Sequence, residues 1–133
     1  STTLPATTLA NNCYNSMFYG CTSLTSAPVL PAMTLAIQCY VSMFRSCTSL
    51  KLSTTLPATT LANNCYNSMF RSCTSLKLST TMTGIYDTAY RIPTTGTGTT
   101  AYDALTNMFT GTGGTFKGTP TINTTYYTEN TPV

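Results

Sequence analysis

Apolar residues in the N-terminal part of the chain follow two alternating patterns. From Leu61 they recur at i, i+1, i+4, i+5, i+8, i+9 and i+12, which is typical of one wide face of an amphipathic helix. Thr60 is a suitable N-cap for this helix, and Pro57 keeps it from beginning earlier. Residues 75–79 instead alternate polar and apolar side chains, which predicts a short strand.

The two patterns together form one repeat unit. Cys13, Cys39 and Cys65 lie 26 residues apart (39 − 13 and 65 − 39), and the segments 1–26 and 53–78 differ at only four positions. A fixed period in the twenties is typical of stacked repeats that each contribute one strand. We therefore predict an α/β solenoid. It is a leucine-rich-repeat right-handed coil with one short parallel strand and one short helix per 26-residue repeat.

The period breaks after Met82 and returns once, where residues 107–112 match residues 16–21. Met108 follows Met69 at a sequence separation of 39 (108 − 69), which exceeds the repeat period by 13 (39 − 26) and indicates an insertion of that length. We predict a solenoid of about three repeats at 1–82 and an irregular C-terminal cap with an inserted Thr/Gly-rich loop at 83–133. The chain begins inside a strand half, so we expect either further N-terminal repeats or a partner that covers the open end.

Composition narrows the possible functions. Only 7% of the 133 residues are charged, against about a quarter in ordinary globular domains, and threonine is the most frequent residue. A polar but weakly ionised surface is typical of secreted and cell-surface proteins. No run approaches the roughly 20 apolar residues of a membrane span, and the modest charge of +3 does not indicate a nucleic-acid partner. Without histidine and with three acids, we expect no enzyme and no cofactor.

The repeated cysteines admit three interpretations. Two cysteines eight residues apart on a helix would be about 12 Å apart, beyond the roughly 7 Å that a disulfide allows between Cα atoms. A disulfide becomes possible if the helix ends earlier. A metal site lacks histidine and the short CxxC pair. We favour buried free thiols that fill the core as small apolar side chains. This structural core column comprises Cys13, Cys39, Cys65, Cys21, Cys47 and Cys73.

The repeat resembles a known family. The motif CYxSMFxxCTSL, with LPATTLA upstream, is similar to the BspA-like leucine-rich repeats of Bacteroidetes surface proteins, and the resemblance covers the whole repeat region. The Thr/Gly-rich ending with INTTYYT is similar to the ends of such chains. Family members are typically secreted or surface-anchored, several act in adhesion and protein binding, and related repeats occur in phage proteins. The resemblance implies an extracellular or cell-surface location and carries no catalytic residue.

Four of the six bases stand in the repeats, whereas all three acids follow them. We predict a ligand-binding strip on the exposed strand face and the helix ends, suited to acidic glycans or a carboxylate-rich protein. The alternative is that these cations serve solubility, and helix C-termini also favour the arginines. The candidate residues are Lys51, Lys77, Ser49, Ser75, Thr25, Arg45 and Arg71, with Ser23 on the same strand face.

Weaker signals lie elsewhere in the chain. Tyr14, Tyr40 and Tyr66 form a column that we expect to pack in the core with wet hydroxyl groups. Thr88 stands in a short motif similar to an O-glycan acceptor of secreted Bacteroidetes proteins, and Asn123 fits an N-glycan acceptor. The cap tyrosines could form a binding loop. These are Tyr86, Tyr90, Tyr102, Tyr126 and Tyr127.

The sequence thus predicts a non-catalytic binding or adhesion module that recognises a host protein or glycan through its strand face or cap loop. The alternative is a structural subunit or spacer of an extracellular appendage, fibre or phage tail. In that case the partners would be neighbouring copies of the chain, bound through the open N-terminal end.

Overall fold

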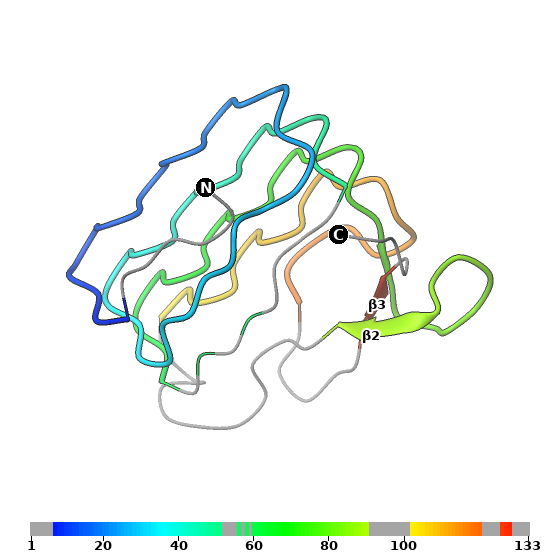
Figure 1. Ribbon diagram of the computed structural model, residues 1–133. Coiled ribbons are helices and arrows are strands. Elements are labelled where there is room, and N and C mark those ends of the chain that lie inside the picture. Colours follow the sequence, from blue (N-terminus) through cyan, green and yellow to red (C-terminus); the bar gives the residue numbers. More distant parts are fainter. Residues whose placement is uncertain are drawn as a thin grey trace.

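The computed structural model describes residues 7–51, 56, 58, 60–90, 102–120 and 126–128. Its regular secondary structure is one small antiparallel sheet, formed by β1 (Leu78–Ser79), β2 (Thr88–Tyr90) and β3 (Tyr126–Thr128). The strand order is β1-β3-β2, so the C-terminal strand lies between the other two. Figure 1 shows this sheet beside a stack of parallel coils that makes up most of the molecule.

The predicted α/β solenoid with one helix and one parallel strand per repeat is wrong. The described residues contain no helix, and their three strands pair antiparallel rather than in a parallel stack. Among the described residues, the parallel bridges between repeats join single residues, Thr8 with Thr34 and Thr34 with Thr60. Of the predicted strand at 75–79, only Leu78 and Ser79 form a strand. They pair with β3.

The segments predicted as helices are series of tight turns. We name them turn segments 1 to 4, at residues 10–21, 36–47, 62–73 and 103–112. Within them, N–H groups donate to the carbonyl three residues earlier, as from Cys13 to Ala10 and from Met17 to Tyr14. Every fourth residue has a positive φ between 50° and 79°. These residues are Asn12, Ser16, Gly20, Gln38, Ser42, Ser46, Asn64, Ser68, Ser72, Asp103, Asn107 and Gly111.

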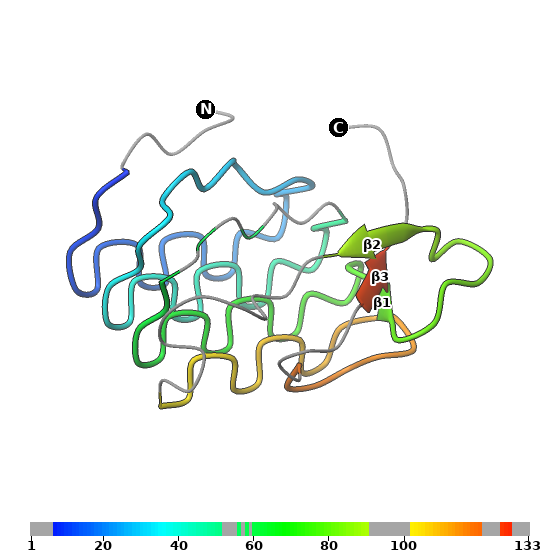
Figure 2. The same ribbon diagram turned by 90° about the horizontal axis from the view of Figure 1, so that it is seen from below.

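The remaining N–H groups join neighbouring turn segments. In turn segment 1 the even-numbered residues donate to odd-numbered carbonyls of turn segment 2, for example Phe18 to Met43 at 2.9 Å, at a constant sequence separation of 25 (43 − 18). Turn segment 2 donates to turn segment 3 in the same register, as from Phe44 to Met69. Successive N–H groups therefore alternate between a hydrogen bond inside their own turn segment and a hydrogen bond to the next turn segment. Figure 2 shows the resulting square-wave course of the stacked coils.

The hydrophobic pattern explains why this structure forms instead of a helix. Apolar pairs such as Met69 and Phe70 recur with a period of four residues. Four residues of an α-helix turn the chain by about 400°, so such pairs would drift by about 40° at each step around the helix. A turn structure with a strict four-residue period keeps every pair on one face. Asparagine, aspartate and glycine also tolerate the required left-handed conformation better than most residues.

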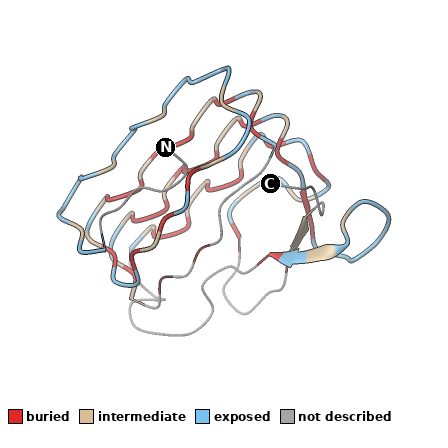
Figure 3. Ribbon diagram, in the orientation of Figure 1, coloured by how far each residue is buried: buried red, intermediate tan, exposed pale blue. Residues whose placement is uncertain are grey.

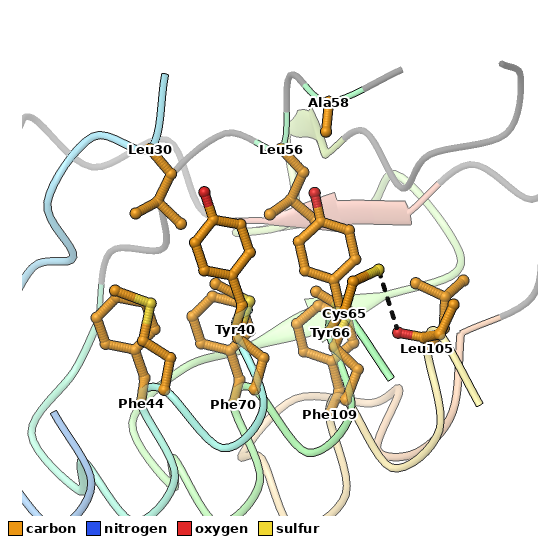
Figure 4. Packing of buried hydrophobic residues seen from close by; sticks show 14 of the residues in the cluster. Leu30, Tyr40, Phe44, Leu56, Ala58, Cys65, Tyr66, Phe70, Leu105 and Phe109 are labelled. Atoms are coloured by element: carbon orange, nitrogen blue, oxygen red, sulfur yellow. Dashed lines mark hydrogen bonds between the residues drawn. The ribbon is translucent and has the colours of Figure 1, made fainter. Parts of the chain in front are cut away.

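Stacking in register brings identical side chains together. The rings of Phe18, Phe44, Phe70 and Phe109 form a column with centroids 5.4–5.6 Å apart and nearly parallel planes. The rings of Tyr14, Tyr40 and Tyr66 form a second column. Figure 4 shows the inner members of both columns within the core, with Leu30 and Leu56 close to the tyrosines. The stacked ring of Phe109 supports the alignment of residues 107–112 with the repeat, although in turn form.

The inserted segment leaves this register intact. Turn segment 3 donates to turn segment 4 at a sequence separation of 38 (108 − 70) instead of 25, as from Phe70 to Met108 at 2.9 Å. The difference of 13 (38 − 25) equals the inserted length. After turn segment 4, residues 113–120 return along the stack, where the N–H of Gly113 donates to Leu76 and that of Phe116 to Leu78. Phe116 thereby packs beside β1 and β3.

Candidate functional site

Lys51 and Lys77 occupy equivalent positions on neighbouring coils, and both are exposed. Thr25 is the third member of this column and is also exposed; its carbonyl accepts the N–H of Lys51 at 3.0 Å. The carbonyl of Lys77 accepts the hydroxyl of Thr128 in β3 at 3.2 Å. The column therefore runs from the first coil to the small sheet. The first of these hydrogen bonds joins Thr25 and Lys51, and none of the three residues lies in a strand, so they do not form the predicted strand face.

Arg45 and Arg71 form a second column, at the ends of turn segments 2 and 3. Both are half-buried, and the guanidinium of Arg45 lies 5.6 Å from the ring centroid of Tyr19 on turn segment 1. A contact of this kind contributes about 0.5–1 kcal/mol at an exposed site. Because no helix exists here, the predicted interaction with a helix C-terminus does not apply. Among the described residues, the two arginines and two lysines of the repeats make no ion pair.

The predicted serines have different roles from the cations. Ser49 and Ser75 are half-buried, and the hydroxyl of Ser75 donates to the carbonyl of Thr48 at 2.7 Å. This hydrogen bond joins adjacent coils and uses the only proton of the hydroxyl. Ser23 is exposed. The strip available to a ligand is therefore formed by the cations, Thr25 and Ser23.

The cysteines fall into two groups. Cys39, Cys47, Cys65 and Cys73 are buried free thiols, whereas Cys13 and Cys21 are exposed. The thiols of Cys47 and Cys73 donate to the carbonyls of Phe18 and Phe44 on the preceding coil, at 3.0 and 2.9 Å. The buried part of the predicted core column is as expected, but the two cysteines of the first coil are not in the core.

Burial makes the inner thiols poor nucleophiles. Desolvation raises the pKa of Cys39 and of Cys73 to about 12, and that of Cys65 to about 11. The pKa of Cys47 is also raised, mainly by burial. These thiols remain protonated at neutral pH, which suits packing rather than chemistry. In the described part of the chain, no group of three or more Cys, Asp or Glu side chains could hold a metal ion.

The inner tyrosines of the column pack in the core as predicted, but the prediction of wet hydroxyl groups is wrong, because Tyr40 is 2% and Tyr66 is 1% exposed. Tyr40 and Tyr66 are buried, and Tyr14 on the first coil is half-buried. Desolvation raises the pKa of both buried phenols. The cap tyrosines do not form one surface, because Tyr90 and Tyr126 are buried whereas Tyr102 is 69% exposed.

The modification signals lie at the cap. Thr88 is half-buried in β2, an edge strand, and its hydroxyl donates to the carboxylate of Asp87 at 3.1 Å. Asn123 lies outside the described residues. No helix in the described part of the chain is long and apolar enough to cross a membrane.

The sequence did not predict the exposed carbonyls and apolar side chains of the first coil. The carbonyls of residues 11, 13, 15, 17 and 19 accept no hydrogen bond among the described residues, although their equivalents in turn segments 2 and 3 do. Met17 is 49% exposed, whereas the equivalent Met43 and Met69 are fully buried. The motif residues Cys, Tyr, Met and Phe are the same in all three segments, so they give no signal that distinguishes the exposed segment.

Comparisons with known proteins give no further identification. No family model, no curated protein and no solved structure matches this chain.

Proposed function

We propose that the chain is a non-catalytic binding module that recognises an anionic partner, a glycan or an acidic protein surface, through its two cation columns. The observation that supports the proposal is the placement of Lys51, Lys77, Arg45 and Arg71 on adjacent coils without an ion pair among the described residues. Like charges on neighbouring coils repel each other slightly, so apart from the contact of Arg45 with Tyr19 the columns add no stability of their own. An anion between them would reverse this repulsion.

The spacing of the columns suits an extended ligand. Neighbouring coils lie at the distance of their stacked rings, 5.4–5.6 Å for the phenylalanine column. A polymer with regularly placed carboxylate or sulfate groups could contact two cations in successive coils, and the field of four cations would steer it. The resemblance to BspA-like surface repeats supports an extracellular or cell-surface location and a host protein or glycan as the partner. No cofactor is needed for such binding.

The test is binding to sialylated mucin at low and moderate salt, with desialylated mucin as the ligand control. The Lys51→Ser, Lys77→Ser double variant should bind about tenfold more weakly, and binding should fall with salt because exposed charges are screened. The matched control is Arg91→Ser, Lys117→Ser, which removes the same charge outside the repeats. Equal loss in both double variants, or equal binding of both mucins, would contradict recognition by the columns.

A structural role in an appendage, fibre or phage tail is the second candidate function. The observation that favours it is the exposed apolar face of turn segment 1, because such a face commonly marks an interaction site. Sedimentation of the isolated chain tests it. Concentration-dependent assembly without mucin binding would replace the binding module by a structural subunit.

A further inference from the structure

Each turn segment has two chemically different faces. One face presents the N–H groups that donate to the next segment, and the other presents the carbonyls that accept from the previous one. Turn segment 2 shows both, since Phe44 donates to Met69 and Met43 accepts from Phe18. We name these the donor face and the acceptor face. The stack is directional, because a donor face can pair only with an acceptor face.

The acceptor face of turn segment 1 is exposed. Its five carbonyls at residues 11, 13, 15, 17 and 19 are equivalent to those that pair in turn segments 2 and 3, but accept no hydrogen bond in the described part of the chain. The side chains on this face are also uncovered. Met17 is 49% exposed and Phe18 is half-buried, whereas Met43 and Phe44 are fully buried. Figure 3 shows this outermost coil as mostly exposed beside its largely buried neighbours.

The occupant of this face can be specified from the interfaces already present. It must supply N–H donors at every second residue and a ring to stack on Phe18. It must also supply a carbonyl for the thiol of Cys21, as Phe18 does for Cys47 at 3.0 Å. The donor face of the same repeat provides all three. We infer that the acceptor face of turn segment 1 docks one further unit of the 26-residue repeat, in register with the three units of this chain.

A second copy of this chain does not meet the requirement. Two acceptor faces brought together would oppose carbonyl to carbonyl without a donor. The donor face of turn segment 4 is already occupied in part, because Asn107 donates to the hydroxyl of Thr119 at 2.8 Å and Phe109 to the carbonyl of Gly118 at 3.0 Å. The ring of Phe109 is covered by Phe116 and Tyr90. The occupant is therefore a repeat unit with a free donor face. This inference does not rest on the proposed anion binding.

The experiment adds one unit to the chain. Residues 27–52 are copied directly upstream of Ser1, which keeps the register because Leu52 is naturally followed by Ser53 of a segment nearly identical to 1–26. In the copy, both cysteines are replaced by serine, so that every thiol counted belongs to the original chain. The matched control carries a scrambled segment of the same length and composition. All proteins are labelled with a small thiol reagent under native conditions.

Cys13 and Cys21 are the reporters. In the 133-residue chain and in the scrambled control, both should react readily. In the extended chain, their reaction should slow by at least about 100-fold, as for thiols that react only after local opening, and the denaturation midpoint should rise. Unchanged reactivity in the extended chain would overturn the inference. So would protection of both thiols in the original chain with concentration-dependent dimers, since a second copy would then cover the face.

Discussion

The two ends of the stack carry the same kind of turn segment but differ in how they are covered. At the C-terminal end, Met108 and Phe109 are fully buried, and Phe109 contacts Phe116 and Tyr90 edge to face. At the N-terminal end, the equivalent Met17 is 49% exposed and Phe18 stacks on one side only. The repeat sequence therefore does not determine its own burial. Non-repeated residues decide which end is closed.

The cap also replaces the chemistry that a next coil would supply. Thr112 stands where the repeats have cysteine, and its hydroxyl donates to the carbonyl of Phe109 at 2.9 Å. In the repeats, the corresponding thiol reaches the preceding coil instead, as from Cys73 to Phe44. At the cap, local hydrogen bonds and the returning segment 113–120 thus pair the backbone groups of the last coil. At the open end, the carbonyls of the first coil have no such partner among the described residues.

The largest expected difference concerns the aromatic column. Phe70→Ala should lower the free energy of unfolding by about 3–5 kcal/mol, because it leaves a cavity between two stacked rings in a fully buried site. Phe18→Ala, at the half-buried end of the same column, should cost only about 1–2 kcal/mol. Urea denaturation of both variants measures the difference. Equal costs would mean that the open end is covered in solution.

The second largest difference should be in the stability lost when a glycine at each end is replaced by alanine. In Gly114→Ala, the added Cβ would fall on the backbone oxygen and nitrogen of Leu78, so the returning segment must move and we expect a loss of about 3 kcal/mol or more. Gly20→Ala meets open space and has a φ of 73°, so its cost is the left-handed conformation alone, about 1 kcal/mol. Thermal unfolding compares them. A larger loss for Gly20→Ala would contradict the exposed end.

Thiol reactivity is the third contrast. Two thiols, Cys13 and Cys21, should react in the native protein and all six in denaturant. The four buried thiols should react at least about 100-fold more slowly, which corresponds to an opening free energy of about 2.7 kcal/mol. Burial raises the pKa of Cys39 to about 12, so the folded site holds almost no thiolate. The slow reaction therefore passes through the opened form, and it should accelerate between pH 7 and 9 as for an ordinary cysteine. Mass spectrometry of labelled peptides checks both statements.

The smallest effect concerns the left-handed column at positions 20, 46, 72 and 111. Glycine occupies both ends, whereas Ser46 and Ser72 hold φ values of 62° and 64° in the middle. Ser46→Gly should raise the free energy of unfolding by about 0.5 kcal/mol, because relief of a strain of about 1–2 kcal/mol exceeds the added freedom of the unfolded chain. Ser49→Gly, without a positive φ, is the control and should destabilise. Denaturant titration would refute the strain argument if both variants lost stability equally.

The sequence predicted the repeat, its register and much of the core, because these follow from the spacing of apolar residues. Phe44, Phe70 and Cys65 are buried as their positions in the repeat indicate. The prediction of a helix failed because a period of four was interpreted as a period of 3.6. Asn64 and Ser68, which are four residues apart and both at positive φ, mark the turns of this four-residue period.

The candidate site was predictable only in part. Placing Lys51 and Lys77 in one column requires the 26-residue period alone, and the structure shows one step of that column, in which Lys51 donates to Thr25. That Ser75 is bound to Thr48, and that the first coil leaves a row of carbonyls unpaired among the described residues, depends on the path of the backbone between side chains. No pattern of residue types encodes that path when the same residues recur in each repeat.

The register between neighbouring coils does not depend on the length of the chain that connects them. This has a consequence for the gene. Turn segments 3 and 4 pair correctly across the inserted segment, because the hydrogen bonds, and not the connecting chain, set the alignment. Unequal recombination that adds or removes a whole unit would leave a donor face against an acceptor face at the new junction. Variants of different length should therefore arise without new compensating substitutions, and alleles should differ in repeat number more readily than in the sequence of the cap.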